Sequence, residues 1–288
     1  MCYQSQRNSH IVGNFFLHSA IHRRAKWTKV PERVKPQTDP LTWFKAALYL
    51  SLTLMIMLFS SGISPFLLVS SLGNKLNVAY LIPRETFTNE GFIFLNEKYL
   101  LLAVAVTIAS PIYWNVFCRY EYYTKRLSRT AGSPSLALVI FAVSILLLSS
   151  FREWTFFRAM SRQPFIELQA VWIRSIVYLI GYSLLSFGLI LSATGFYQLG
   201  IFGTYMGEYF GFMFDQKIES FPFNYFCDPM YFGSTLMHYG HSLLSLSPTG
   251  IFLSTLLGFT YWLAARCFEG PFMNAMYAAK NRLGRSSS

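Results

Sequence analysis

Five long apolar segments constrain this chain more than any other feature of its sequence. They run over residues 43–72, 100–116, 136–151, 175–196 and 249–267. Because about 20 apolar residues in a helix span the hydrocarbon core of a bilayer, these segments are of the length that enters a membrane. Backbone polar groups inside lipid must bond to one another, so we expect every segment to be helical. The segments predict an all-α polytopic membrane protein.

Charge is scarce and unevenly placed, which favours the same interpretation. Charged residues make up 13% of the chain, whereas a soluble domain carries about 25%. The net charge of +11 comes from bases that lie between the apolar segments, where the positive-inside rule and anionic lipid explain them. We therefore expect no nucleic-acid partner. The cysteines are scattered, and His238 and His241 lack further ligands, so we expect interfacial polar histidines and no metal.

Composition divides the chain into four parts. Residues 1–42 form a basic polar tail, 43–98 an additional N-terminal membrane helix and a loop, 99–282 the main membrane domain, and 283–288 a polar C-terminal tail. The acid-poor first tail is typical either of a mitochondrial presequence or of a cytosolic segment that touches anionic lipid. We favour the second interpretation.

The basic residues predict which connections lie on which side of the membrane. The connection 152–174, which includes Arg152 and Glu153, is basic, and so is the C-terminal tail from Lys280 onward. Both are expected in the cytosol. The stretch 215–248 has more acidic than basic residues, and we expect a structured lumenal connection there, held at the interface by its aromatic side chains.

The same rule fixes the number of crossings. The tail at 1–42 is expected in the cytosol, so the chain must cross an even number of times before residue 152. We therefore expect the short segment 100–116, with Pro111 near its end, to be re-entrant or interfacial. The fold would then have about four crossing helices and one that does not cross. This arrangement leaves the bases of 119–129 in the lumen, against the positive-inside rule.

Glu208 is the first of two carboxylates in or beside apolar sequence, where a charge is costly and is usually functional or paired. It lies in GTYMGEYFG, in which Gly203, Gly207 and Gly211 recur every four residues. On a helix these glycines form one stripe of small residues, which is typical of close helix packing in membranes.

Glu269 is the second carboxylate. It lies in RCFEGPF, just before Pro271, which we expect to end or bend the last apolar helix. A negative charge at a helix C-terminus is unfavourable, so either Arg266 or a cationic ligand is expected to offset it.

Six further motifs follow one another from residue 110 to residue 272 of the chain. They are SPIYWNVFCRYEYYTKRLSRTAGSP (110–134), FREWTFFRAMSRQP (151–164), LGIFGTYMGEYFG (199–211), PFNYFCDPMYFGST (222–235), SPTG (247–250) and EGPF (269–272). In this order they resemble the phosphatidylethanolamine N-methyltransferase family over roughly residues 100 to 282.

The resemblance implies an activity and a location. Members of this family transfer methyl groups from S-adenosylmethionine to the amine of phosphatidylethanolamine or its mono- and dimethyl forms, toward phosphatidylcholine. The substrate would be a phospholipid in the bilayer, and the membrane that of the endoplasmic reticulum, with the mitochondrial membrane as the alternative. The family also has a partly inserted helix before three crossing ones, which is similar to the arrangement predicted above.

The resemblance further implies a cofactor site. A GxG motif of the family falls on Ser186, Phe187 and Gly188, and a Glu-Glu pair falls on Glu269 and Gly270. Each motif keeps only part of the family pattern. One more residue than the family usually has separates Tyr261 from Glu269.

The resemblance implies that Glu269 lies at the cofactor. From the residues themselves we expect Glu208, as a catalytic residue, near the lipid ammonium. Tyr205, Tyr209 and Tyr231 either bind the methylated ammonium through cation–π attraction or form an interfacial belt. Two alternatives stand beside phospholipid methylation: a methyltransferase of isoprenylated cysteine or another lipid amine, and a non-catalytic membrane paralogue.

Overall fold

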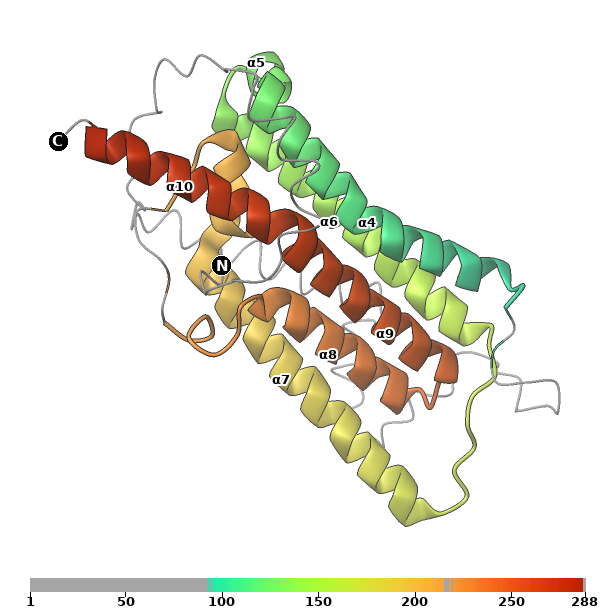
Figure 1. Cartoon of the computed structure of the whole chain (residues 1–288). Helices are drawn as coiled ribbons and strands as arrows, with labels where there is room; N and C mark the ends of the chain where they lie inside the picture. Colours follow the sequence, from blue (N-terminus) through green and yellow to red (C-terminus); the bar gives the residue numbers. More distant parts are fainter. Residues whose placement is uncertain (1–92, 94, 215–217, 219, 287–288) are drawn as a thin grey trace.

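A computed structural model describes residues 93, 95–214, 218 and 220–286 of the chain, with side chains up to residue 280. The tail at 1–42 and the apolar segment 43–72 lie outside these residues. Within the described part every regular element is a helix (Figure 1). Four stretches are long and apolar enough to cross a bilayer, so the prediction of an all-α polytopic membrane protein is confirmed.

The chain order of the helices sets the layout. They are α4 (Lys98–Thr124), α5 (Arg126–Thr130), α6 (Pro134–Ser161), α7 (Val171–Thr204), the 3-10 turn η2 (Gly207–Phe210), α8 (Pro229–Leu244), α9 (Pro248–Leu263), the π-helical turn η3 (Ala264–Glu269) and α10 (Gly270–Ser286). In Figure 1, α4 lies beside α6, and α8 lies between α7 and α9. The main core lies where α4, α6, η2, α9 and α10 meet.

Ser-Pro pairs start two of the membrane helices. The Ser133 side chain accepts a hydrogen bond from the Leu136 N–H at 3.2 Å, and the Ser247 side chain accepts one from the Gly250 N–H at 3.1 Å. Each serine is an N-cap, and the proline after it takes the first helical position, where no N–H is needed. These caps place the starts of α6 and α9 at fixed points of the chain.

The turn between α8 and α9 lies at the same end of the bundle as the connection between α6 and α7. The Ile166 N–H donates to the Leu246 carbonyl oxygen at 2.8 Å, and we name this the Leu246 end. The chain returns to it through α8, a 16-residue helix that packs against α7 and α9. The prediction that all of 215–248 lies on the side opposite 152–174 is therefore wrong for the part from 229 onward, because Pro229–Leu244 is a helix that returns the chain. Residues 221–228 form a connection, as predicted.

The opposite end of the bundle, the α5 end, gathers basic residues. Lys125 Nζ donates to the Tyr209 carbonyl oxygen at 2.8 Å, and Lys280 Nζ donates to that of Phe214 at 2.9 Å. Partial burial lowers the pKa of the Lys125 ammonium. The C-terminal helix thus lies with the bases of 119–129 and opposite the α6–α7 connection, contrary to the predicted sides. The conflict of 119–129 with the positive-inside rule thereby moves to the other end, because 119–129 and the C-terminal helix share one end and Arg158, Arg162 and Arg174 lie toward the other.

Helix α4 is longer than its apolar run. It has 27 residues and continues through Pro111, and by length and composition it can cross a membrane. The argument that segment 100–116 is too short to cross is therefore wrong. The other argument for partial insertion rests on the tail at 1–42, which lies outside the described residues, so the partial insertion of α4 stays a prediction.

Helix α6 also extends past its apolar run, to Ser161. Arg152 and Glu153 consequently lie inside a helix, and they are only 5% and 8% exposed. The prediction that they belong to a solvated connection is wrong. Opposite charges inside a membrane span are expected to be paired and are candidates for a functional role.

Glycines bring the backbones of α7 and α8 into contact. A Cβ atom on Gly188 would lie 2.5 Å from the carbonyl oxygen of Gly233, and one on Gly240 would lie 2.7 Å from that of Gly181. Small residues allow such close approach, which compensates for the weak hydrophobic attraction between helices in lipid.

The predicted glycine stripe in GTYMGEYFG does not exist as a helix face. Gly203 lies at the end of α7, Gly207 begins η2, and Gly211 follows η2 with φ 103°. Met206, between the first two, is left-handed with φ 58°. The chain therefore turns sharply here, and the turn directs Glu208 into the bundle, where it is 2% exposed.

The α7–α8 contact leads to a first prediction. We expect Gly188→Ala to lower the free energy of unfolding by about 1–3 kcal/mol, because the added methyl group overpacks a backbone contact. Thermal unfolding in detergent measures the effect. Ser186→Ala is the matched control, since Ser186 is exposed on the same helix and should leave stability unchanged. Equal stability of Gly188→Ala and wild type would contradict the close packing.

Candidate active site

The π-helical turn η3 places Glu269. It spans Ala264–Glu269, between α9 and α10, and the helix continues through Pro271 into α10 instead of ending there. One extra residue in a regular α-helix would rotate everything after it by about 100°. A π turn absorbs one residue without that rotation. The additional residue that the resemblance predicts between Tyr261 and Glu269 would be accommodated by η3 in this way.

The Glu269 carboxylate accepts hydrogen bonds from two other helices. Its Oε1 atom accepts from Trp114 Nε1 at 2.8 Å and from Asn115 Nδ2 at 2.9 Å, both on α4. The Tyr231 hydroxyl, on α8, lies 3.0 Å from Oε1 and 3.1 Å from Oε2. Three neutral donors therefore converge on one carboxylate, an arrangement that fixes its orientation.

Arg266, one of the two expected partners of Glu269, does not bond to it. Among its described hydrogen bonds none comes from Arg266, whose residue is exposed. The nearest described arginine on α4, Arg119, instead donates to the Phe268 carbonyl oxygen at 2.9 Å. Its guanidinium carbon lies 5.1 Å from the centroid of the Phe272 ring. This arginine therefore links α4 to the helical junction that carries Glu269.

The rings of the donors Trp114 and Tyr231 pack together with the ring of Tyr261. The Tyr231 and Tyr261 rings stack with centroids 4.4 Å apart and an angle of 13° between their planes. Trp114 lies 6.3 Å from the Tyr231 centroid at 23°. Tyr231, one of the three predicted cation-binding tyrosines, thus belongs to the Glu269 site and is not part of an interfacial belt.

Glu208 lies close to the Glu269 site but has few partners. Its Oε1 atom has one long contact of 3.5 Å with the Tyr277 hydroxyl, and its Oε2 atom has no donor among the described residues. The Tyr209 hydroxyl is likewise buried without a partner in the described part of the chain. Cys118 of α4 lies within electrostatic range of both glutamates. An unpartnered carboxylate oxygen and an unpartnered hydroxyl therefore form a place where a polar ligand would be stabilised.

The residues matched to the GxG motif lie elsewhere on the bundle. Ser186 and Phe187 are exposed on α7, and Gly188 packs against the Gly233 carbonyl oxygen of α8. None of the described hydrogen bonds of Glu269 comes from α7. Gly270, in contrast, adjoins Glu269, and a Cβ atom on it would lie 2.9 Å from the Ala265 carbonyl oxygen. The structure thus brings Gly270 to the site and leaves Gly188 across α8.

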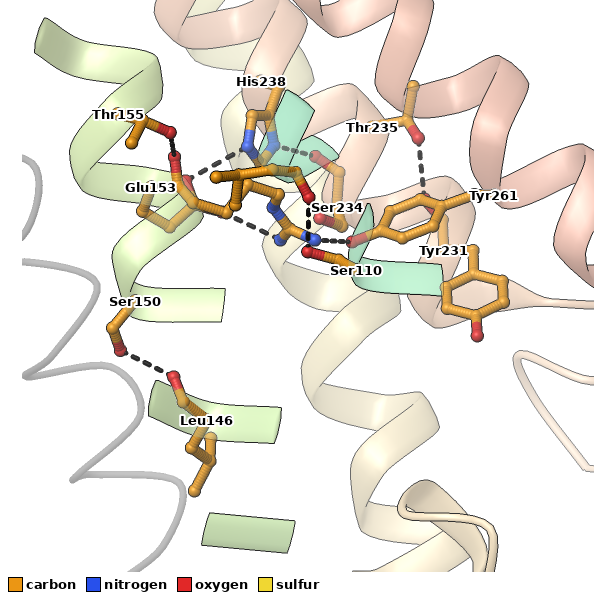
Figure 2. Close-up of polar contacts among 12 residues, drawn as sticks. Ser110, Leu146, Ser150, Glu153, Thr155, Tyr231, Ser234, Thr235, His238 and Tyr261 are labelled. Carbon is orange, nitrogen blue, oxygen red and sulfur yellow. Dashed lines mark hydrogen bonds and ion pairs between the residues drawn. The ribbon is translucent and has the colours of Figure 1, made fainter. Parts of the chain in front are cut away.

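A second polar cluster joins α6, α8 and α9 (Figure 2). Arg152 Nη2 donates to Glu153 Oε1 at 3.0 Å, and Glu153 Oε2 lies 3.1 Å from His238 Nε2. Arg152 Nη1 lies 2.6 Å from the Tyr261 hydroxyl oxygen, to which it donates. His238 is 4% exposed, so the prediction of an interfacial histidine is wrong.

Comparison with known proteins identifies the family. A family model described as phospholipid methyltransferase matches residues 176–280. Human phosphatidylethanolamine N-methyltransferase is 38% identical over 186 residues, which cover 65% of this chain and 91% of the human protein. This chain belongs to the phospholipid methyltransferase family. The Saccharomyces cerevisiae phosphatidyl-N-methylethanolamine N-methyltransferase is 34% identical over 190 residues, which cover 65% of this chain and 89% of the yeast protein. No solved structure matches the chain.

Sequence reasoning missed several polar residues of this phospholipid methyltransferase. Trp114 and Asn115 lie in the motif SPIYWN but have no spacing that ties them to Glu269. Arg152 and Glu153 directly follow an apolar run, and adjacent opposite charges at such a place are a usable signal of a buried pair. His238 gives no such signal, because its partner comes from another helix.

Proposed function

We propose that this chain is an S-adenosylmethionine-dependent phospholipid N-methyltransferase. It methylates the amine of phosphatidylethanolamine, of its mono- and dimethyl forms, or of all three, toward phosphatidylcholine. The carrying observation is that relatives named for these reactions match over about nine-tenths of their own lengths, and that Glu269, in the matching EGPF motif, is held inside the bundle by α4 and α8.

The residues around Glu269 suit S-adenosylmethionine, which supplies an activated methyl group on a sulfonium. The cofactor carries hydroxyls and an ammonium, from which a protein carboxylate can accept hydrogen bonds. It also carries a carboxylate of its own, which a protein guanidinium can bind. Glu269 and Gly270 would contact the cofactor, and Arg119 lies beside them on the Phe268 carbonyl oxygen. The roles of Ser186, Phe187 and Gly188 follow only from the family motif.

Positioning and proton removal are the tasks left to the protein. Methyl transfer to nitrogen is an in-line displacement, so alignment of donor and amine contributes much of the rate. The amine attacks through a lone pair, so a protonated ammonium must first lose its proton to a nearby group. Glu208 has a carboxylate oxygen with no donor among the described residues, and it serves as the group that faces the ammonium.

The lipid tails would approach from the side of α6 and α7. An apolar recess there is lined by Val139, Ala142, Val143 and Leu146 of α6 and by Ile201 and Tyr205 near the end of α7. Tyr205 therefore contacts the tails rather than the ammonium. The recess lies close along the chain to Glu208, three residues after Tyr205, so a headgroup could reach Glu208 while its tails remain in the bilayer.

The α5 end would lie on the cytosolic side of the endoplasmic reticulum membrane. It carries the bases of 119–129 together with the basic C-terminal helix, and these charges favour the cytosolic side. Glu269 lies in the half of the α9–α10 span nearer this end, where a water-soluble methyl donor can reach it.

Methyl transfer from labelled S-adenosylmethionine tests the function directly. Membranes that contain the protein would receive phosphatidylethanolamine or its mono- or dimethyl form in separate reactions, with protein-free membranes as the control. Label in phospholipid establishes the activity, and the preferred acceptor identifies the step. A folded protein that labels no acceptor would favour the non-catalytic paralogue, as the departures at Ser186 and Gly270 suggest.

Glu208→Gln leads to a second prediction. We expect the KM for the lipid to rise about tenfold, because the variant loses a charge-assisted contact to the ammonium. The affinity for S-adenosylmethionine should stay the same, which serves as the internal control. Stability should not fall, because a neutral amide is less costly to bury than an unpaired carboxylate. Wild-type turnover at every lipid concentration would remove Glu208 from the mechanism.

A further inference from the structure

The buried cluster of Arg152, Glu153 and His238 has no role in the function proposed above. Arg152 and Glu153 come from α6 and His238 from α8, and the three are 5%, 8% and 4% exposed. Such residues inside a membrane span are expensive, so a purely apolar substitute would be expected unless they serve a purpose. Figure 2 shows that the cluster faces Tyr261 of α9.

The Arg152 guanidinium is held from two helices. Glu153 accepts its Nη2 hydrogen bond at 3.0 Å and is in turn 3.1 Å from His238. The other His238 ring nitrogen, Nδ1, lies 2.8 Å from the Ser234 carbonyl oxygen. Glu153 bonds Arg152 through one carboxylate oxygen and His238 through the other, and the second ring nitrogen of His238 bonds its own helix. The direction of the guanidinium is therefore fixed relative to both α6 and α8.

A continuous set of contacts leads from Arg152 to Glu269. Arg152 Nη1 donates to the Tyr261 hydroxyl at 2.6 Å, and the Tyr261 ring stacks on Tyr231 at 4.4 Å. The Tyr231 hydroxyl in turn donates to the Glu269 carboxylate. Stacked aromatic pairs occur over a range of offsets, with ring centroids about 4.5–7 Å apart, so stacking alone leaves the two rings some freedom of position. The hydrogen bond from Arg152 therefore decides where the pair of rings stays.

We propose that Arg152 is a positioning residue for the methyl-donor site, acting through Tyr261 and Tyr231 on Glu269. The proposal rests on the proposed function. Catalytic and binding groups must be held within about 0.5 Å of their productive geometry, and the residues that support them achieve this. Arg152, backed by Glu153 and His238, gives Tyr231 such support from the interior of the bundle.

Two conservative variants and their combination test this inference. Tyr261→Phe removes only the hydroxyl that Arg152 bonds and keeps the stacked ring, and Arg152→Lys keeps the buried positive charge. Each should weaken equilibrium binding of labelled S-adenosylmethionine about tenfold, the size expected for a lost hydrogen bond to a charged group. The double variant should be no weaker than either single one, because both remove the same contact. The KM for the lipid should change less than the affinity for the donor.

Ser254→Ala is the matched control. It removes a buried hydrogen bond of 3.0 Å between Ser242 of α8 and Ser254 of α9 that does not lead to Glu269. This variant should unfold at a lower temperature and bind the methyl donor as wild type does. If Arg152 has only a structural role, Tyr261→Phe should behave as Ser254→Ala does, with a lower unfolding temperature and an unchanged affinity for the methyl donor.

The possible results separate the inference from the function. In two cases the role of Arg152 is wrong and the function stands, provided that wild type binds the donor and methylates lipid. In the first, Tyr261→Phe binds the donor as tightly as wild type does. In the second, the loss of donor affinity in the double variant equals the two single losses multiplied together. If wild type neither binds the donor nor methylates lipid, both are wrong. Weaker donor binding in both single variants and no further loss in the double variant supports the inference.

Discussion

Glu269→Gln lowers methyl transfer by about 100-fold or more, the loss expected when a preorganised charged group at a reacting site is replaced. The amide has nearly the same shape, so the helix junction at η3 should remain. However, the amide replaces one carboxylate oxygen, which accepts hydrogen bonds, with an N–H₂ group, which can only donate. The groups that now donate to the carboxylate are Trp114 Nε1, Asn115 Nδ2 and the Tyr231 hydroxyl. The side chain must then turn or lose partners, and the negative charge that would bind the methyl donor is gone. Initial rates with saturating lipid and varied S-adenosylmethionine measure the effect.

Glu167→Gln is the control for that experiment. Glu167 is an exposed carboxylate in the α6–α7 connection, and its loss should leave the rate unchanged. Equilibrium binding of labelled S-adenosylmethionine should fall in Glu269→Gln and not in Glu167→Gln. If Glu269→Gln retains full binding and turnover, Glu269 is not part of the donor site, and the converging donors have only a structural role.

Apolar runs and short motifs predicted a large part of this molecule. The runs at 100–116, 136–151, 175–196 and 249–267 each lie within a helix that the structure describes, because a chain in lipid can satisfy its backbone only in that way. The motif EGPF drew attention to Glu269, and its hydrogen bonds to α4 and α8 place it inside the bundle. These signals are local, so no knowledge of distant contacts was needed.

The arrangement of the helices depended on information that the sequence does not carry locally. Helix α8 has 16 residues and contains serine, threonine and histidine, so it does not appear as an apolar run. Its polar groups are satisfied by contacts with other helices, as in the pair of Ser242 with Ser254. The prediction lacked α8, which returns the chain to the Leu246 end, so the basic C-terminal helix was put at the wrong end relative to 152–174.

Backbone geometry explains the other misses. The four-residue spacing of Gly203, Gly207 and Gly211 predicts a helix face only if the chain between them is helical, and Met206 with φ 58° breaks it. The same glycine spacing could not reveal that the real close packing pairs Gly188 with Gly233. The spacing of small residues therefore could not say which helices they bring into contact.

Arg152→Met lowers the free energy of unfolding by about 3–5 kcal/mol, because it leaves the Glu153 carboxylate buried with one partner fewer. Methionine keeps the length and flexibility of the arginine stem, so little packing is lost. The Tyr261 hydroxyl also loses its donor. Thermal or chemical unfolding in detergent, followed by helical circular dichroism, measures the change. A chain that lacks both charges, Arg152→Met with Glu153→Met, should recover much of the loss, because apolar replacement of a whole buried pair is often nearly neutral.

Arg158→Met makes the same substitution on the same helix and separates charge burial from helix effects. Arg158 is exposed and lies over the Trp154 ring, so its replacement should change stability by less than about 0.5 kcal/mol. Equal losses at positions 152 and 158 would mean that helix propensity, and not the buried pair, sets the result. A double variant as unstable as Arg152→Met would show that Glu153 is not destabilised by the missing guanidinium, and the pairing of these two charges would then contribute little to the fold.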